Sequence, residues 1–436
     1  MRKFLVVIGS LAVLGLVAVA AIIWVPAGRT PAQPEPAIKM AEATPEYAAR
    51  LGDCAGCHTA PGGKPFAGGL AVASPLGTIW SSNITPDPDH GIGKWTLADF
   101  RGALYDGISR DGHRLYPAMP SSNYRTFSEQ DVKALYAYFT KDVAPVAISP
   151  PETKLSFPFN QRWGLRVWEW IAYPKAGFVP SFDDPVLNRG AYLVEGPGHC
   201  GACHTPRTAT LAQAAYTATD AAFLSGGSLG AWTVPSLRGP NSAPTRWTVA
   251  EMTTWLTTGR NAHAGVAGEM VSVIQHSTQY LTDDDASAVA TYLRHVAWNG
   301  DPPKDVTSAL PPSRSATETL LRAAAPDMAL GPRLYLDNCN ACHFVNGMGA
   351  GGVFPKLVGN STVLAKAPGG LLDVVLNGAS MPSTAARPSG LRMPGFGHRL
   401  SDAEAAALLT FVRSAWGNSA GVVSADDVRK ARGAAQ

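Results

Sequence analysis

The sequence predicts an all-α protein in which three tandem domains follow an N-terminal transmembrane helix. Three observations support this prediction: a short cysteine motif that occurs three times, a helix pattern that recurs around each motif, and a long apolar run at the N-terminus. The chain has 436 residues, which is too long for one hydrophobic core. Only 16% of the residues are charged and the net charge is +3, so we expect no nucleic-acid partner.

All six cysteines belong to three Cys-x-x-Cys-His motifs. A disulfide framework needs no adjacent histidine, and a thioredoxin-like motif would not occur three times. The motifs lie about 140 residues apart, whereas the paired motifs of a zinc ribbon lie about 15–20 residues apart. The pattern therefore predicts three covalently bound haem c groups. The predicted thioether-forming residues are Cys54, Cys57, Cys200, Cys203, Cys339 and Cys342.

The same motifs predict the ligands of each haem iron. The histidine that ends a motif becomes the proximal ligand, and a methionine or histidine on the other side gives a closed iron that transfers electrons. A methionine follows each motif shortly before the helix that closes its block. The predicted ligand pairs are His58 with Met119, His204 with Met270, and His343 with Met393.

Several residues are alternatives to these ligands or support them. Met381 could replace Met393, which we prefer because it lies next to the closing helix, as Met119 does. Three histidines would instead give bis-histidine haems, namely His113, His263 and His398. A proximal imidazole usually donates its second N–H to a carbonyl. The candidate carbonyls are those of Pro86, Pro235 and Pro355.

A helix pattern recurs around each motif. A helix-like run leads into the motif, and a middle helix ends at a glycine suited to a left-handed C-cap. The middle helices start at Trp95-Thr96 and Trp247-Thr248 and end at Gly107 and Gly259, and the looser third counterpart is 371–378. The closing helices have Ser128, Thr282 and Ser401 as N-caps, each followed three residues later by Asp131, Asp285 or Glu404.

These repeats define the predicted domain boundaries. Each repeat is expected to form an all-helical, class I-like cytochrome c domain. The ranges are 1–25 for a transmembrane anchor or signal, 26–42 for a Pro-rich tether, 43–149, 183–303 and 325–418 for the three domains, 150–182 for an aromatic linker and 419–436 for the tail. The composition of the aromatic stretch fits either a membrane-interfacial segment or a linker between two haem domains.

The N-terminal run predicts the cellular location. Residues 4–25 are uncharged and mostly apolar, and as a helix they would span about 33 Å. Arg2 and Lys3 place the N-terminus in the cytoplasm, so the haem domains would face the periplasm from the bacterial inner membrane. We prefer a retained anchor, although Ala18-Val19-Ala20 would also suit cleavage of a signal peptide.

No second catalytic motif accompanies the haem motifs. The sequence has no phosphate-binding loop, no GxSxG and no HExxH, and the glycine stretches 226–227 and 349–352 indicate loops. We therefore expect an electron carrier that is not catalytic alone. The alternative is a peroxidase-like multi-haem enzyme in which one iron lacks its methionine.

From about residue 46 to residue 418 the sequence resembles the triple-haem cytochrome c subunits of membrane-bound bacterial alcohol, aldehyde and gluconate dehydrogenases. The most specific stretches are Phe66-Ala-Gly-Gly-Leu70, Ser82-Asn-Ile-Thr-Pro-Asp-Pro88, Arg189-Gly-Ala-Tyr-Leu-Val-Glu-Gly-Pro197, His204-Thr-Pro-Arg207, Ser277-Thr-Gln-Tyr-Leu281 and Arg392-Met-Pro-Gly-Phe-Gly397. The resemblance implies that the chain takes electrons from a separate dehydrogenase subunit and passes them to ubiquinone or a terminal oxidase. It also implies that Met119, Met270 and Met393 are the sixth iron ligands.

The resemblance leaves two types of partner open. Family members that accompany quinoprotein alcohol dehydrogenases look like proteins with a cleaved signal. A long N-terminal helix is more similar to the cytochromes of molybdenum-dependent aldehyde dehydrogenases. The substrate of the partner is not encoded in these motifs.

Overall fold

The computed structural model of the chain describes residues 28–38, 44–240, 242–302 and 315–434, with isolated positions before residue 26. Backbone contacts divide the chain into two compact units. The first contains residues 1–180, 195–199 and 208–213, and the second contains residues 181–194, 200–207 and 214–436. The first predicted domain falls mainly in one unit, and the other two share the second unit.

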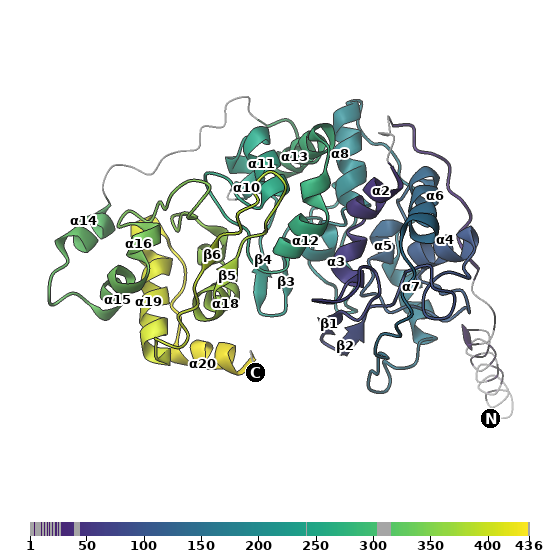
Figure 1. Cartoon of the computed structure of the whole chain (residues 1–436), viewed down its shortest axis with the longest axis horizontal. Coiled ribbons are helices and arrows are strands. Elements are labelled where there is room, and N and C mark those ends of the chain that lie inside the picture. Colours follow the sequence, from purple (N-terminus) through teal and green to yellow (C-terminus); the bar gives the residue numbers. More distant parts are fainter. Residues whose placement is uncertain are drawn as a thin grey trace. The chain divides into compact units, whose positions relative to one another are not determined.

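The first unit is built from short helices and one hairpin (Figure 1). Its elements are α2 (Pro45–Leu51), α3 (Cys54–His58), β1 (Ala71–Ser74), β2 (Gly77–Trp80), α4 (Leu97–Asp106), α5 (Ser121–Tyr124), α6 (Glu129–Ala137), the π-helix η1 (Tyr138–Asp142) and α7 (Gly164–Ala172). α2 packs against α6 and η1. Ala48, Val132 and Leu135 are buried in this core, and the edge of the Phe66 ring meets Phe139 at a centroid distance of 5.1 Å.

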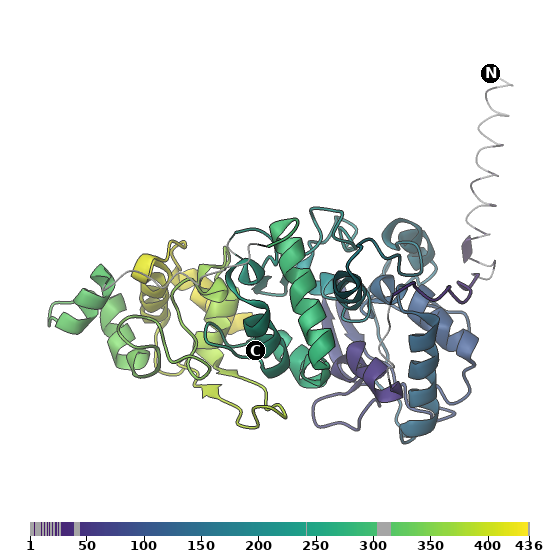
Figure 2. The same ribbon diagram turned by 90° about the horizontal axis from the view of Figure 1, so that it is seen from above.

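The second unit contains the other two motifs. Its elements are α8 (Pro185–Glu195, all but its last residue), α9 (Gly201–His204), β3 (Gly227–Leu229), β4 (Trp232–Val234), α10 (Ala243–Arg246), α11 (Val249–Thr258), α12 (Met270–His276), η2 (Thr278–Tyr280), α13 (Asp283–Trp298), α14 (Ala316–Ala323), α15 (Leu330–Asn338), α16 (Asn340–His343), α17 (Ser361–Leu364), α18 (Gly369–Asn377), β5 (Ala379–Ser380), β6 (Arg392–Met393), α19 (Asp402–Ser414), η3 (Ala415–Gly417) and α20 (Ala425–Ala434). α11 packs along α13, the long green helix of Figure 2, and α15 packs on α19.

In the second unit, the helix before each motif packs closely on the helix that closes the block. A Cβ added at Gly190 of α8 would lie 2.5 Å from Tyr292 Cβ of α13. A Cβ added at Gly331 of α15 would lie 2.7 Å from the Ala407 carbonyl oxygen and 2.9 Å from Phe411 Cβ of α19. Only glycine permits helices to approach this closely, so both blocks depend on it.

The predicted helix ends are confirmed. The hydroxyls of Ser128, Thr282 and Ser401 accept hydrogen bonds from the backbone N–H groups of Asp131, Asp285 and Glu404. Gly107 and Gly259 end α4 and α11 in the left-handed conformation. Local side-chain chemistry is sufficient to place these boundaries, which is why the sequence predicts them correctly.

The prediction of an all-α fold is wrong, because the structure contains three two-stranded antiparallel sheets. They pair β1 with β2, β3 with β4, and β5 with β6. In the first sheet Val72 lies opposite Ile79, and in the second Leu229 lies opposite Trp232. Strands this short leave too little alternation of polar and apolar residues to be recognised in a sequence.

The prediction of three tandem domains is also wrong, because the second and third blocks form one unit. The backbone N–H of Gly352 donates to the Asn261 carbonyl at 2.9 Å. The Arg260 guanidinium donates to the Ser389 carbonyl at 3.2 Å. The predicted linker comprises residues 150–182. Of these, residues 150–180 belong to the first unit, where Trp168 Nε1 donates to the Thr210 carbonyl at 2.8 Å.

The prediction of a transmembrane protein of the bacterial inner membrane is corrected as well. Within the described ranges, no helix is both long enough and apolar enough to cross a membrane. Most of the predicted anchor, residues 1–25, and part of the tether, residues 26–42, lie outside the described residues.

Candidate haem-binding sites

Each Cys-x-x-Cys-His motif lies at a short helix that comes after a longer one in the chain. The short helices are α3, α9 and α16, which follow α2, α8 and α15. None of the six cysteines forms a disulfide. Side chains three and four residues apart lie on the same face of a helix. Each motif therefore presents two thiols and one imidazole to the same side.

Each of the three motif histidines forms the same kind of hydrogen bond, from its ring to a backbone carbonyl. Their Nδ1 atoms lie 2.7 Å from the Ser82 carbonyl for His58, 2.9 Å from the Pro235 carbonyl for His204, and 2.9 Å from the Pro355 carbonyl for His343. A carbonyl oxygen can only accept, so Nδ1 carries the proton in each ring. Nε2 therefore keeps a free lone pair. This nitrogen is the one that binds a metal when Nδ1 is held in this way.

The predicted carbonyls are confirmed at two of the three sites. Pro235 and Pro355 accept from their histidines, whereas Pro86 does not, because the Ser82 carbonyl takes that place. The hairpin β1–β2 brings Ser82 to the motif, since the Gly69 N–H donates to the Ser81 carbonyl at 2.9 Å. The hairpin was not predicted, and the error at Pro86 follows from that.

A glycine with positive φ binds the backbone of each motif histidine. The N–H groups of Gly68, Gly226 and Gly349 donate to the carbonyls of His58, His204 and His343 at 2.8, 2.7 and 3.2 Å, respectively. Their φ angles are 72°, 97° and 58°. The glycines follow their histidines at unequal distances, so spacing does not reveal them. The sequence indicated only loops at 226–227 and 349–352.

These glycines also contact the segments that orient the histidine rings. A Cβ at Gly68 would lie 2.5 Å from the Ser82 carbonyl carbon, and one at Gly349 would lie 2.8 Å from the Pro355 oxygen. Each glycine is thus packed between a motif and the chain that accepts from its imidazole. A larger residue would push the two apart.

Burial sets the protonation of the motif side chains. It lowers the pKa of His58, His204 and His343, so the three imidazoles are neutral at neutral pH. It raises the pKa of the first thiol of each motif to about 12. These thiols are those of Cys54, Cys200 and Cys339.

The predicted axial methionines lie in comparable surroundings. Met119, just before α5, is half-buried and packs against the core of the first unit. Met393, on β6, is half-buried and packs against the core formed by α15, α18 and α19. Met270 begins α12 and is also half-buried. Their roles as iron ligands stay predictions.

Three of the four alternative ligands have other contacts in the structure, and the fourth, His398, is exposed. A Cβ at Gly265 would overlap Met381 Cε, so this methionine packs on the loop after α11. His263 uses both ring nitrogens, with Nε2 2.7 Å from Glu251 Oε1 and Nδ1 3.2 Å from Lys356 Nζ. His113 is exposed, and its Nδ1 lies 2.5 Å from an Asp111 oxygen.

The residues at each motif fit a covalently bound haem. Two thiols can form thioethers, and a neutral imidazole with its Nδ1 proton bound to a carbonyl offers Nε2 to iron. The structure places these groups by the same backbone contacts three times.

Comparison with known proteins agrees with this geometry. Residues 328–416, which include the third motif and Met393, match the family model described as Cytochrome c. The chain is 44% identical over 393 residues to the cytochrome c subunit of the quinone alcohol dehydrogenase of Gluconobacter oxydans, covering 89% of this chain and 81% of that protein.

Two further relatives extend the comparison. The gluconate 2-dehydrogenase cytochrome c subunit of Pantoea cypripedii is 40% identical, with 89% of this chain and 88% of that protein covered. The fructose dehydrogenase cytochrome subunit of Gluconobacter japonicus is 38% identical, with 88% and 81% covered. The chain therefore belongs to the family of cytochrome c subunits of alcohol, gluconate and fructose dehydrogenases.

Proposed function

We propose that this chain binds three haem c groups and relays electrons from a dehydrogenase catalytic subunit to ubiquinone or a terminal oxidase. The observation that carries the proposal is the hydrogen bond from a motif imidazole to a backbone carbonyl, which occurs at all three motifs. Three sites that prepare Nε2 in the same way support three haems of the same kind. We infer that the stretches 43–149, 183–303 and 325–418 hold one haem each.

The proposed roles of the side chains follow from their chemistry. The cysteines at 54, 57, 200, 203, 339 and 342 form the thioethers. The iron ligands are His58 and Met119, His204 and Met270, and His343 and Met393. A bound haem supplies a one-electron iron couple, which methionine ligation leaves without an open coordination position. The carbonyl acceptors keep each imidazole in one orientation, and the core residues packed against Met119 and Met393 limit the access of water to these two ligands.

Haem content and spin state test this proposal. We expect the purified protein to contain three covalent haems per chain by mass spectrometry and by pyridine haemochrome absorption. EPR should show only low-spin iron, and the oxidised protein should show the weak near-infrared band of methionine ligation. One high-spin haem that binds added cyanide or peroxide would instead support the peroxidase-like alternative for that site.

The partner is proposed from the relatives. Relatives named as subunits of a quinone alcohol dehydrogenase are 42–44% identical over 81–83% of their length. A subunit of the nicotinate dehydrogenase of Pseudomonas putida is 38% identical, but over 29% of its length. The similarity therefore favours a quinone alcohol dehydrogenase as the partner.

Copurification and reduction test the partner. A tagged chain expressed in its native host should copurify with a dehydrogenase, and ethanol or an aldehyde should then reduce its haems. Reduction by an aldehyde alone would support the molybdenum enzyme. For the acceptor, the reduced protein is mixed with a short-chain ubiquinone, and rapid reoxidation supports the quinone. No reoxidation, with rapid oxidation by a terminal oxidase preparation, supports the oxidase.

A further inference from the structure

Arg260 is a buried cation whose guanidinium is largely unpaired. It lies in the loop after α11 and is 7% exposed. Its Nη2 donates to the Ser389 carbonyl at 3.2 Å, whereas Nε and Nη1 have no hydrogen-bond partner. Buried guanidinium groups are normally paired with an anion, because an unpaired buried charge is costly. The free N–H groups therefore indicate that an anion belongs beside Arg260.

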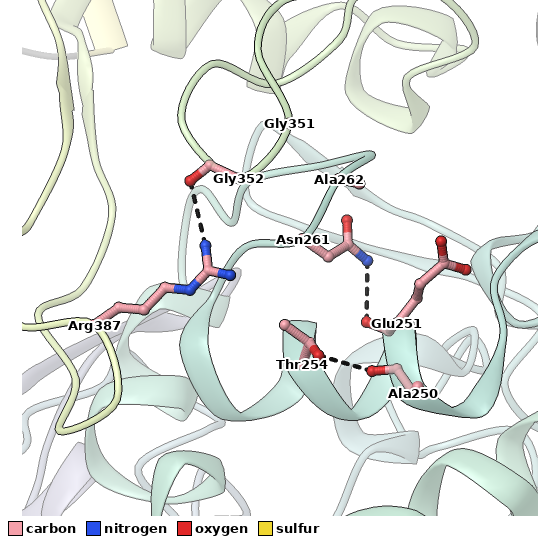
Figure 3. Close-up of a pocket in the computed structure, with 8 residues that line it drawn as sticks. All are labelled: Ala250, Glu251, Thr254, Asn261, Ala262, Gly351, Gly352 and Arg387. Carbon is pink, nitrogen blue, oxygen red and sulfur yellow. Dashed lines mark hydrogen bonds between the residues drawn. The ribbon is translucent and has the colours of Figure 1, made fainter.

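A second arginine lies close to this position. Arg387 donates from Nη1 to the Gly352 carbonyl at 3.3 Å, as Figure 3 shows. The pKa of Arg260 is lowered mainly by its own burial and, to a smaller extent, by the positive charge of Arg387. Two cations this close repel each other unless an anion lies between or beside them. In the part of the chain that the structure describes, no carboxylate is ion-paired with either arginine.

A cavity of about 320 Å³ lies beside this position. Arg387 and Asn261, the residue that follows Arg260, line it, whereas Arg260 itself does not. The cavity lies over α11, beneath the loop that contains Gly351 and Gly352 (Figure 3). Glu251 also lines it, but both of its carboxylate oxygens are used, one by Thr248 and one by His263. The cavity thus has space for a ligand, and the Glu251 carboxylate that lines it is paired with His263 and with neither arginine.

The loops that carry the two arginines point to the kind of anion. Arg260 lies ten residues before Met270, and Arg387 lies six residues before Met393. Each loop therefore leads directly into a residue proposed to ligate a haem iron. A haem c carries two propionate carboxylates at its edge, and Arg is well suited to bind a carboxylate through two N–H groups.

We propose that Arg260 and Arg387 form a binding site for a haem propionate carboxylate. The inference rests on the proposed function, since it requires haems at the second and third motifs. The carboxylate belongs to one of these two haems. The site links the blocks around both motifs, because its two cations come from different blocks of the same unit.

Redox titration of the holoprotein tests the site. A positive charge beside a propionate favours the reduced iron, which carries one positive charge less than the oxidised iron. In R260Q we therefore expect the midpoint potential of one haem to fall. At a fixed solution potential the ratio of oxidised to reduced haem should rise about tenfold, or about 59 mV for a one-electron couple. R387Q should lower the midpoint potential of the same haem, and R260K should leave that midpoint potential close to its value in the unaltered protein.

The affected haem is identified with two marker variants. M270H and M393H replace methionine by histidine, which lowers the potential of the second or the third haem. If the component missing from the M270H titration is the one that shifts in R260Q, the propionate belongs to the second haem. If it is the one missing in M393H, the propionate belongs to the third haem. Either result supports the site.

R413Q is the matched control. Arg413 is also buried in the second unit, but its guanidinium donates to the carbonyls of Gly421 and Val363. Its loss should lower stability without a shift in one haem potential. Three haems with unchanged potentials in R260Q and R387Q would overturn the site and leave the proposed function intact. If R260Q does not fold, an unchanged potential in R387Q overturns it, whereas fewer than three haems in the unaltered protein contradict the proposed function instead.

Discussion

The chemistry of each motif histidine depends on one hydrogen bond that its sequence motif does not contain. The acceptor carbonyls lie 24, 31 and 12 residues beyond His58, His204 and His343. A motif fixes the thiols and the imidazole because they share one helical turn. The tautomer and orientation of the ring depend on chain that folds back onto the motif, so they require the structure.

The methionine proposed as the axial ligand of the third haem can be tested with a matched pair of variants. Met393 packs against the core of its block, whereas Met381 packs against Gly265. We expect Met393→Ala to remove about one third of the near-infrared methionine band and to lower the potential of one haem. Met381→Ala should leave both unchanged. The measurement is near-infrared absorption of the oxidised protein, and loss of the band in Met381→Ala alone would reverse the assignment.

Helices and their ends were predictable because local side chains define them, whereas the hairpins were not. Thr96 and Thr248 begin middle helices, and Gly107 and Gly259 end them, as the sequence indicated. The strands are too short to show a pattern, although β1–β2 and β3–β4 bring their following segments to the motif histidines. The positive-φ glycines Gly68 and Gly226 were missed for the same reason, since their role depends on how those hairpins return.

The glycine that contacts the first motif can be tested against a similar glycine. Gly68 and Gly62 have φ angles of 72° and 69°, but only Gly68 is crowded, with the Ser82 backbone 2.5 Å from an added Cβ. Alanine at a positive φ costs about 1–2 kcal/mol. Gly62→Ala should lose no more than that, and Gly68→Ala should lose a further ~1–3 kcal/mol through overlap. Urea unfolding followed by haem absorbance measures the difference, and equal losses would contradict it.

The capping box of α11 makes the stability of the second unit depend on pH. Burial raises the pKa of Glu251, but hydrogen bonds from Thr248 and His263 outweigh it, so the pKa is lowered overall. The stabilisation is therefore full above the ordinary carboxyl value of about 4.5 and is lost as the pH falls through the lower pKa of the folded state.

Glu251→Gln should reveal this dependence. We expect it to cost about 1 kcal/mol of stability at pH 7, as loss of a good cap does, and less below pH ~4. Urea unfolding at several pH values measures the change. Asp327→Asn, which removes an exposed carboxylate in the same unit, should show little effect at any pH. An effect of Glu251→Gln that does not change with pH would show that the carboxylate charge is not responsible.

At the scale of the whole molecule, the recurrence of one block three times did not predict how the blocks assemble. Repeated motifs indicate similar local structures, but the contacts between blocks come from loops that differ among them. The second and third blocks share one unit because the Gly352 N–H donates to the Asn261 carbonyl and Lys356 Nζ lies within hydrogen-bond distance of His263 Nδ1. These contacts come from individual loop residues, so the repeat pattern could not indicate this joint unit.

The joint unit predicts that loss of the third haem weakens the second. In a Cys339→Ser, Cys342→Ser variant, we expect the thermal transition of the second haem to fall by roughly 5 °C, because contacts between neighbouring blocks are coupled. The matched variant, Cys54→Ser with Cys57→Ser, alters a motif that lies in the other unit. It should leave the transitions of the second and third haems unchanged. Loss of the near-infrared methionine band on heating follows each transition, and equal behaviour of the two variants would mean that the second and third blocks unfold independently.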